Sequence, residues 1–138
     1  MVEIVKPQPD EIVIDPACGS GGFLVESMRY MWRQLEKQAK EYGWSEIALE
    51  EEKKSCAIKC IKGIEKDSFL AKVTKAYMAI LGDGKGGIFC EDALMRPSEW
   101  KNATQQSVGL GHFDVLLANP PFGKDIKVTG EDKLKQYE

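Results

Sequence analysis

The sequence Asn119-Pro120-Pro121-Phe122 places a carboxamide, two rigid rings and an aromatic ring directly after an apolar run. The Asn119 side chain and the Pro120 carbonyl could both accept hydrogen bonds from a planar amino group. Proline fixes φ and restrains the residue before it, so both acceptors would be held in place before a substrate arrives. The pattern favours chemistry at an –NH₂ group. The alternative is a strand that ends at prolines and buries a phenylalanine.

A glycine-rich segment near the N-terminus, DPACGSGGF at residues 15–23, is the second candidate. Glycines between a strand and a helix allow the backbone to approach a ligand closely. The dinucleotide fingerprint G-x-G-x-x-G is incomplete, because Leu24 stands where its last glycine would be. Asp15 would suit a ligand with an amino group or a positive charge. The alternative is an ordinary turn with an acidic cap.

Acidic residues follow two later apolar runs. Glu65 could accept hydrogen bonds from both hydroxyls of a ribose, as acidic residues do in nucleoside-binding α/β folds. Asp92 could accept a hydrogen bond from the amino group of an adenine, and Glu91 competes for that role. Asp67 is better explained as the N-cap of a helix.

Apolar runs predict four strands, within residues 11–14, 57–64, 86–94 and 113–118. Helical spacing predicts a helix from the glycines to about Tyr42, with Ser20 as its N-cap and Gly43 as its stop. We expect a short solvated helix at 45–56, and a loop with about one helical turn at 95–112. A further amphipathic helix ends at Gly82, and its apolar residues share one face: Phe69, Leu70, Val73, Ala76, Tyr77, Ile80 and Leu81.

This alternation predicts an α/β fold with a Rossmann-like, mainly parallel sheet in the strand order 3-2-1-4. Ligands of such sheets bind beyond the carboxyl ends of the strands, at the switch point, which here lies between the first and fourth strands. The glycine turn, Glu65, Asp92 and Asn119 each follow a different strand. We therefore expect them to meet at one edge of the sheet.

Composition bounds the class of protein. With 138 residues, 43% hydrophobic and 30% charged, the chain resembles one soluble globular domain. Signal-peptide and membrane-span patterns are missing from the sequence, so we expect a cytoplasmic protein. The net charge of −3 gives no support for a basic surface that would bind nucleic acid. The four cysteines, with Cys56 and Cys60 one helical turn apart, and the single His112 favour reduced thiols over a metal site.

The decapeptide from Asp15 to Leu24 resembles the S-adenosylmethionine motif of adenine-specific DNA methyltransferases, in particular the modification subunits of type I restriction–modification systems. Asn119-Pro120-Pro121-Phe122 is similar to that family's catalytic tetrapeptide, and residues 63–84 resemble its second-strand and helix segment. The resemblance extends from residue 10 to residue 124. It implies the S-adenosylmethionine-dependent methyltransferase fold, that cofactor, and methylation of the adenine amino group in DNA.

The resemblance also implies a role for each matching position. The residues that would bind the cofactor are Asp15, Ala17, Gly19, Gly21, Phe23, Glu65 (ribose) and Asp92 (adenine). Asn119 and the Pro120 carbonyl would accept hydrogen bonds from the target amino group, held by Pro121, while Phe122 would stack on the base. Two acceptors off the ring plane favour a tetrahedral nitrogen, whose lone pair can point at the methyl group. Extruding a base costs a few kcal/mol, and stacking offsets about 1–3 kcal/mol of that.

The resemblance is partial. The family's upstream motif and N-terminal helical region have no counterpart, and sixteen residues follow Phe122. We expect residues 1–138 to be one partial catalytic domain with a flexible tail at 124–138, inactive alone and without DNA recognition. DNA and the specificity and restriction subunits of a type I complex would be partners of the longer protein. An exposed fourth strand would favour self-association.

Two alternatives stay open. The same tetrapeptide serves methyltransferases that act on RNA bases or on protein glutamine amides, because each substrate presents a planar –NH₂ group. The second alternative is a non-catalytic domain that binds a nucleoside or a partner subunit.

Overall fold

The computed structural model of the chain describes residues 1–82, 87–109 and 111–120. In chain order the elements are α1 (Val2–Val5), β1 (Val13–Asp15), α2 (Gly22–Tyr42), α3 (Glu46–Cys60), β2 (Ile61–Glu65), α4 (Ser68–Leu81), β3 (Ile88–Cys90), the 3-10 helix η1 (Pro97–Glu99), α5 (Asn102–Ser107) and β4 (Val115–Leu116). Pro121, Phe122 and the tail expected at 124–138 lie outside the described residues.

The four strands form one parallel sheet in the order β3-β2-β1-β4. This confirms the predicted α/β class and strand order. Asp15 of β1 lies opposite Gly63 of β2, and Glu65 at the end of β2 lies opposite Cys90 of β3. The carboxyl ends of β1, β2 and β3 therefore meet at one edge, where the sequence places the candidate site.

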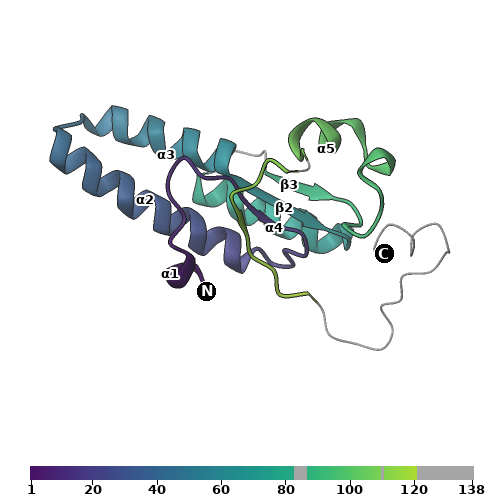
Figure 1. Ribbon diagram of the computed structural model, residues 1–138. Helices are drawn as coiled ribbons and strands as arrows, with labels where there is room; N and C mark the ends of the chain where they lie inside the picture. The colour runs from purple at the N-terminus through teal and green to yellow at the C-terminus, as the bar shows by residue number, and fades with distance from the viewer. Residues whose placement is uncertain (83–86, 110, 121–138) are drawn as a thin grey trace.

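Both faces of the sheet are packed, as a parallel sheet requires. One face packs on α2, α3 and α4, and Figure 1 shows α2 and α3 as long neighbouring helices extending past the sheet. The main buried side chains on this face are Val13, Leu24, Met28, Met31, Ile61, Met78, Ile88, Val115 and Leu117. The segment containing η1 and α5 supplies Trp100 and Val108 to the other face, against Ile14 and Ile64.

Two predicted boundaries are wrong. Residues 57–60 do not begin the second strand but form the last turn of α3, which passes into β2 without a loop. Ala57 and Cys60 are buried on the inner side of that turn, and a short apolar run gives a helix face and a strand the same signal. The N-cap of α2 is Gly21 rather than Ser20, because the backbone takes a left-handed turn there, with φ of 81°.

The remaining elements follow the prediction more closely. Gly43 and Gly82 end α2 and α4 in left-handed conformations, and Asp67 caps α4 by accepting hydrogen bonds from two backbone N–H groups. The predicted solvated helix is present as the first part of α3. The fourth strand is shorter than expected, and the predicted loop holds η1 and α5.

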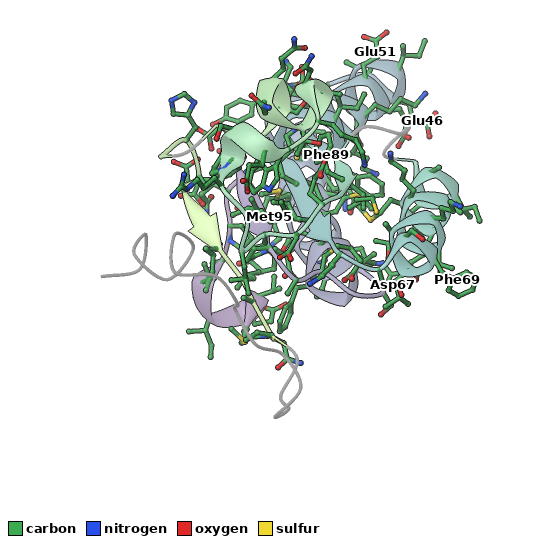
Figure 2. All side chains as sticks on the ribbon, turned by 90° about the vertical axis from the view of Figure 1, so that its right-hand side faces the viewer. Glu46, Glu51, Asp67, Phe69, Phe89 and Met95 are labelled. Carbon is green, nitrogen blue, oxygen red and sulfur yellow. The ribbon has the colours of Figure 1, made fainter. Side chains whose placement is uncertain are left out.

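Most of the predicted apolar face of α4 does not pack on the sheet; of its residues, Leu81 packs against the main core. The buried residues of this helix are Ala71, Thr74 and Met78, on its opposite side. Phe69 is 71% exposed and Ile80 is 82% exposed. Figure 2 shows Phe69 pointing away from the rest of the protein. On the inward side, Thr74 lies against the glycine turn, where a β-carbon at Gly21 would be 2.7 Å from its methyl group, and Met78 packs in the main core.

Within the described ranges, no helix is both long enough and apolar enough to cross a membrane.

The approach of β3 to β2 generates a stability prediction. Gly63 N–H donates to the Gly87 carbonyl over 2.7 Å, and a β-carbon at Gly87 would overlap the carbonyl oxygen of Ile61. Because backbone would have to move, we expect Gly87→Ala to lower the free energy of unfolding by about 1–3 kcal/mol in urea titrations. Gly22→Ala is the control, since a β-carbon there meets no described atom within 4 Å. Equal stability of the two variants would contradict this packing.

Candidate functional site

The turn after β1 is built from backbone hydrogen bonds and two glycines in left-handed conformations. Cys18 N–H donates to the Ile64 carbonyl at 3.0 Å, and Gly21 N–H donates to the Cys18 carbonyl at 2.7 Å. Gly19 and Gly21 have φ of 51° and 81°, values that residues with a β-carbon rarely adopt. A β-carbon at Gly19 would meet no described atom within 4 Å. On that side the described residues leave the backbone open to a ligand.

Two side chains hold Gly19 from either side. Glu65 Oε2 accepts a hydrogen bond from Gly19 N–H at 2.8 Å, while its Oε1 accepts one from Asp67 N–H at 2.7 Å. The Thr74 hydroxyl, fully buried on α4, donates to the Gly19 carbonyl at 2.6 Å. The Thr74 methyl also approaches Gly21 so closely that a β-carbon there would lie 2.7 Å from it. Elements β2 and α4 thus fix the conformation of the turn.

Asp15 is a buried carboxylate at the end of β1. It is 2% exposed, and its Oδ1 accepts a hydrogen bond from Ala17 N–H at 3.0 Å. Burial raises the pKa of the Asp15 carboxyl, the Ala17 hydrogen bond opposes that rise, and the Glu65 carboxylate adds to it. A cationic group placed beside Asp15 would relieve both the burial and the repulsion. The site therefore favours a positively charged ligand.

Cys18 lies in the same turn but is chemically quiet. Burial, together with the Asp15 and Glu65 carboxylates, raises the pKa of the Cys18 thiol to about 12. The thiol is therefore protonated at neutral pH and is a poor nucleophile. Among the described residues there is also no group of three or more histidine, cysteine, aspartate or glutamate side chains that could hold a metal.

The two acidic residues after β3 have different surroundings. Glu91 Oε1 accepts hydrogen bonds from Lys101 N–H at 3.1 Å and from the Thr104 hydroxyl at 2.9 Å, so it anchors the segment around α5. Asp92 forms an ion pair with Lys66 at 2.9 Å and accepts a hydrogen bond from Leu94 N–H at 3.0 Å. Lys66 directly follows Glu65, so this ion pair ties the ends of β2 and β3 together.

Asn119 follows β4 at the same edge of the sheet. Leu117 N–H donates to the Ile14 carbonyl at 3.0 Å, which continues the pairing with β1 beyond the assigned strand. Asn119 and Pro120 are exposed. The register places them beyond the end of β1, the strand that carries Asp15, while Pro121 and Phe122 lie outside the described residues.

The described contacts thus join Asp15, Ala17, Gly19, Gly21 and Glu65 into one cluster. Phe23, in the first turn of α2, is partly buried and packs against the main core. Sequence reasoning missed Thr74, although it is a hydroxyl residue between Ala71 and Met78 at helical spacing. It was hidden because the more apolar side of α4, opposite Thr74, was expected to be the side that faces inward.

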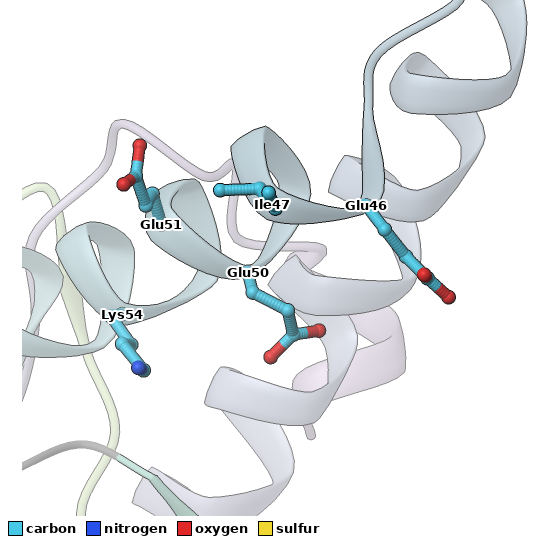
Figure 3. Close-up of a pocket in the computed structure, with 5 residues that line it drawn as sticks. All are labelled: Glu46, Ile47, Glu50, Glu51 and Lys54. Atoms are coloured by element: carbon cyan, nitrogen blue, oxygen red, sulfur yellow. The ribbon is translucent and has the colours of Figure 1, made fainter.

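A shallow depression of about 410 Å³ lies elsewhere, on the exposed side of α3. Figure 3 shows that the side chains around it diverge instead of pointing toward a common centre: Glu46, Ile47, Glu50, Glu51 and Lys54. It offers no convergent set of polar groups for a ligand.

Comparison with known proteins gives consistent relatives. The family model described as N-6 DNA Methylase matches residues 1–138. The MjaVII methylase subunit of a type I restriction enzyme from Methanocaldococcus jannaschii is 30% identical over 138 residues, covering 99% of this chain and 18% of the relative. The MjaVIII methylase subunit from the same organism is 28% identical over 129 residues, covering 91% of this chain and 18% of the relative.

Solved structures agree. A modification subunit described as part of a type I restriction enzyme from Vibrio vulnificus YJ016 matches with a TM-score of 0.65 and 30% identity, covering 100% of this chain and 24% of that one. The type I restriction enzyme EcoKI M protein matches with a TM-score of 0.66 and 22% identity, which supports the fold, covering 94% and 24%. The chain therefore spans less than a quarter of the length of these proteins.

The first prediction from the site concerns Thr74. Thr74→Val keeps the shape of the side chain but leaves the Gly19 carbonyl without its buried donor. We expect a loss of about 1–3 kcal/mol in the free energy of unfolding and faster amide hydrogen exchange at residues 19–21. Ser45→Ala, which removes the N-cap of α3, is the control: it should cost about 0.5–2 kcal/mol without changing exchange in the turn. Unchanged exchange at residues 19–21 in Thr74→Val would show that the Thr74 hydroxyl does not fix the conformation of the turn.

The second prediction concerns Asp15. Its pKa in the folded protein lies above the unfolded value of 3.8, so the folded state holds this proton more tightly. Raising the pH through that window therefore costs the native protein stability, whereas an amide keeps the Ala17 hydrogen bond without charge. We expect Asp15→Asn to gain stability relative to the native protein between pH 3 and pH 7 in urea titrations. The exposed Asp10→Asn should gain less, and equal gains would count against a buried, repelled carboxylate.

Proposed function

The chain belongs to the N-6 DNA methylase family, and from that premise we propose that it forms the catalytic core of a longer adenine-specific DNA methyltransferase. That enzyme would transfer a methyl group from S-adenosylmethionine to the exocyclic amino group of adenine. One observation carries the proposal: the glycine turn, Glu65, Asp92 and Asn119 follow the four strands at one edge of the sheet. A buried acidic residue, Asp15, lies among them.

The donor set of this edge fits S-adenosylmethionine. Asp15 would face the positively charged part of the cofactor, which its burial beside Glu65 favours. The open backbone at Gly19, beside Gly21, would accept the amino-acid end, lined by Ala17 and Phe23. Each oxygen of Glu65 already accepts one backbone hydrogen bond but has a second lone pair, which a ribose hydroxyl can use.

The adenine of the cofactor would lie near β3. Glu91 anchors the segment around α5 through Lys101 and Thr104, so we keep Asp92 as the acceptor for its amino group; the adenine would share the Asp92 carboxylate with Lys66. When bound, the cofactor would supply the methyl group. The residues of the chain would bind the cofactor and orient the target amino group.

The target amino group would be held by Asn119 and the Pro120 carbonyl. Their place after β4, beyond the end of the strand that carries Asp15, supports that assignment. Two fixed acceptors would draw the amino hydrogens out of the ring plane and so make the nitrogen lone pair available. Pro121 would rigidify this pair and Phe122 would stack on the extruded base.

DNA recognition and assembly would belong to the longer protein, since this chain spans 18% of each of the two Methanocaldococcus jannaschii methylase subunits. We infer that DNA and the other subunits of a type I complex are its partners. A cytoplasmic setting is consistent with four free cysteines. β4 is an outer strand of the described sheet with Leu116 65% exposed, so we also infer that it pairs with a further strand, from the longer chain or from a second copy.

Methyl transfer by the longer protein tests the proposal. We expect labelled methyl groups to enter adenine in duplex DNA, and Asn119→Ala to lower the rate about 100-fold or more while calorimetry shows unchanged cofactor binding. Asn102→Ala, at the start of α5, is the control and should leave the rate unchanged. Transfer to RNA or to protein glutamine instead of DNA would overturn the choice of substrate. Absence of S-adenosylmethionine binding would overturn the whole proposal.

A further inference from the structure

Thr74 sets the orientation of the peptide group between Gly19 and Ser20. Its hydroxyl, fully buried on α4, donates to the Gly19 carbonyl over 2.6 Å. The peptide groups of the described residues are trans, and a trans peptide group is planar with its carbonyl and its N–H pointing in opposite directions. Because the Gly19 carbonyl points to Thr74, the Ser20 N–H points away from α4.

The Ser20 N–H is available to a ligand. Ser20 is exposed, and its N–H donates none of the hydrogen bonds formed among the described residues. The neighbouring N–H groups are both occupied, since Gly19 N–H donates to Glu65 and Gly21 N–H donates to the Cys18 carbonyl. Of these three consecutive N–H groups, the structure therefore leaves that of Ser20 free, on the side of the turn that faces away from α4.

The orientation of this donor depends on the Thr74 hydroxyl. Glu65 fixes the peptide group before Gly19, and Thr74 fixes the one after it. A β-carbon at Gly21 would lie 2.7 Å from the Thr74 methyl group, so Thr74 also closes the α4 side of the turn. Glycine resists backbone rotation less than any other residue. Without the hydroxyl, the peptide group after Gly19 would be free to rotate and would carry the Ser20 N–H with it.

We propose that Thr74 is a positioning residue for the amino-acid end of the cofactor. By holding the Gly19 carbonyl, it directs the Ser20 N–H toward the carboxylate of that end, since a carboxylate accepts a stronger hydrogen bond than a neutral group does. The nucleoside end lies along Glu65 and Asp92 and does not use this peptide group. The inference rests on the proposed function, because it takes S-adenosylmethionine as the ligand.

Calorimetry of the longer protein tests the role of the hydroxyl. Thr74→Val should weaken S-adenosylmethionine binding about 5- to 30-fold, the equivalent of ordering the backbone of one residue when the ligand binds. Thr74→Ser keeps the hydroxyl and should restore most of the affinity. Ser45→Ala is the matched control, because it removes another hydrogen bond between a hydroxyl and the backbone, at the start of α3, and should leave the affinity unchanged.

Two analogues of the cofactor locate the effect. S-adenosylhomocysteine has the amino-acid end and methylthioadenosine lacks it, while the sulfur is neutral in both. Thr74→Val should weaken binding of S-adenosylhomocysteine and leave that of methylthioadenosine nearly unchanged, whereas a general loss of structure would weaken both. Equal losses for the two analogues, or unchanged binding of S-adenosylhomocysteine, would overturn the inference.

Amide hydrogen exchange of the unsubstituted longer protein provides a measurement that does not require a variant to fold. Exchange at the Ser20 amide should slow when S-adenosylhomocysteine is added but not when methylthioadenosine is added. Lack of protection by S-adenosylhomocysteine contradicts the role of the Ser20 N–H. If the unsubstituted protein does not bind S-adenosylmethionine, the proposed function fails and this inference with it. If it binds and Thr74→Val binds equally well, this inference alone fails.

Discussion

The rest of the site depends on two hydrogen bonds to the backbone of Gly19. Its N–H is bound by Glu65 from β2, and its carbonyl is bound by Thr74 from α4. Three elements that are distant in sequence are thereby joined at one residue, which has a left-handed backbone conformation. A free glycine loop would lose much backbone entropy on meeting a ligand. Here the protein has already ordered the loop during folding.

The same edge of the sheet concentrates negative charge in a poorly solvated place. Burial raises the pKa of the Asp15 carboxyl and of the Cys18 thiol, and the Glu65 carboxylate adds to both rises. A core made only for stability would avoid this arrangement. A ligand that brings positive charge and hydrogen-bond donors, as we propose, would offset this cost.

The architecture was accessible from the sequence because two simple rules act together. Alternating strands and helices predict a parallel sheet, and ligands gather where its strands end, so Glu65, Asp92 and the glycine turn could be placed before any coordinates. Asp67, Gly43 and Gly82 were identifiable as caps because their side chains, or the lack of one, suit those positions. The assignments of Asn119, Pro120, Pro121 and Phe122 remain predictions.

Other features depend on tertiary contacts that periodicity cannot reveal. In the helical turn that ends at Cys60, the thiol donates to the Pro9 carbonyl at 3.2 Å, a contact between residues distant in the sequence. Thr74 faces inward because the glycine turn offers an acceptor there. The more apolar side of α4 is exposed, so amphipathic spacing identified a helix but not its orientation. The boundary of a helix and the side that it turns inward therefore depend on the elements that pack against it.

The direct passage from α3 into β2 has a consequence for how the chain tolerates change. Loops normally absorb insertions and small rotations, but no loop separates Cys60 from Ile61. One residue added in α3 would turn the strand over, because side chains alternate between the two faces of a sheet. Glu65 would then point away from Gly19. The number of residues in α3 therefore determines the direction in which the Glu65 side chain points.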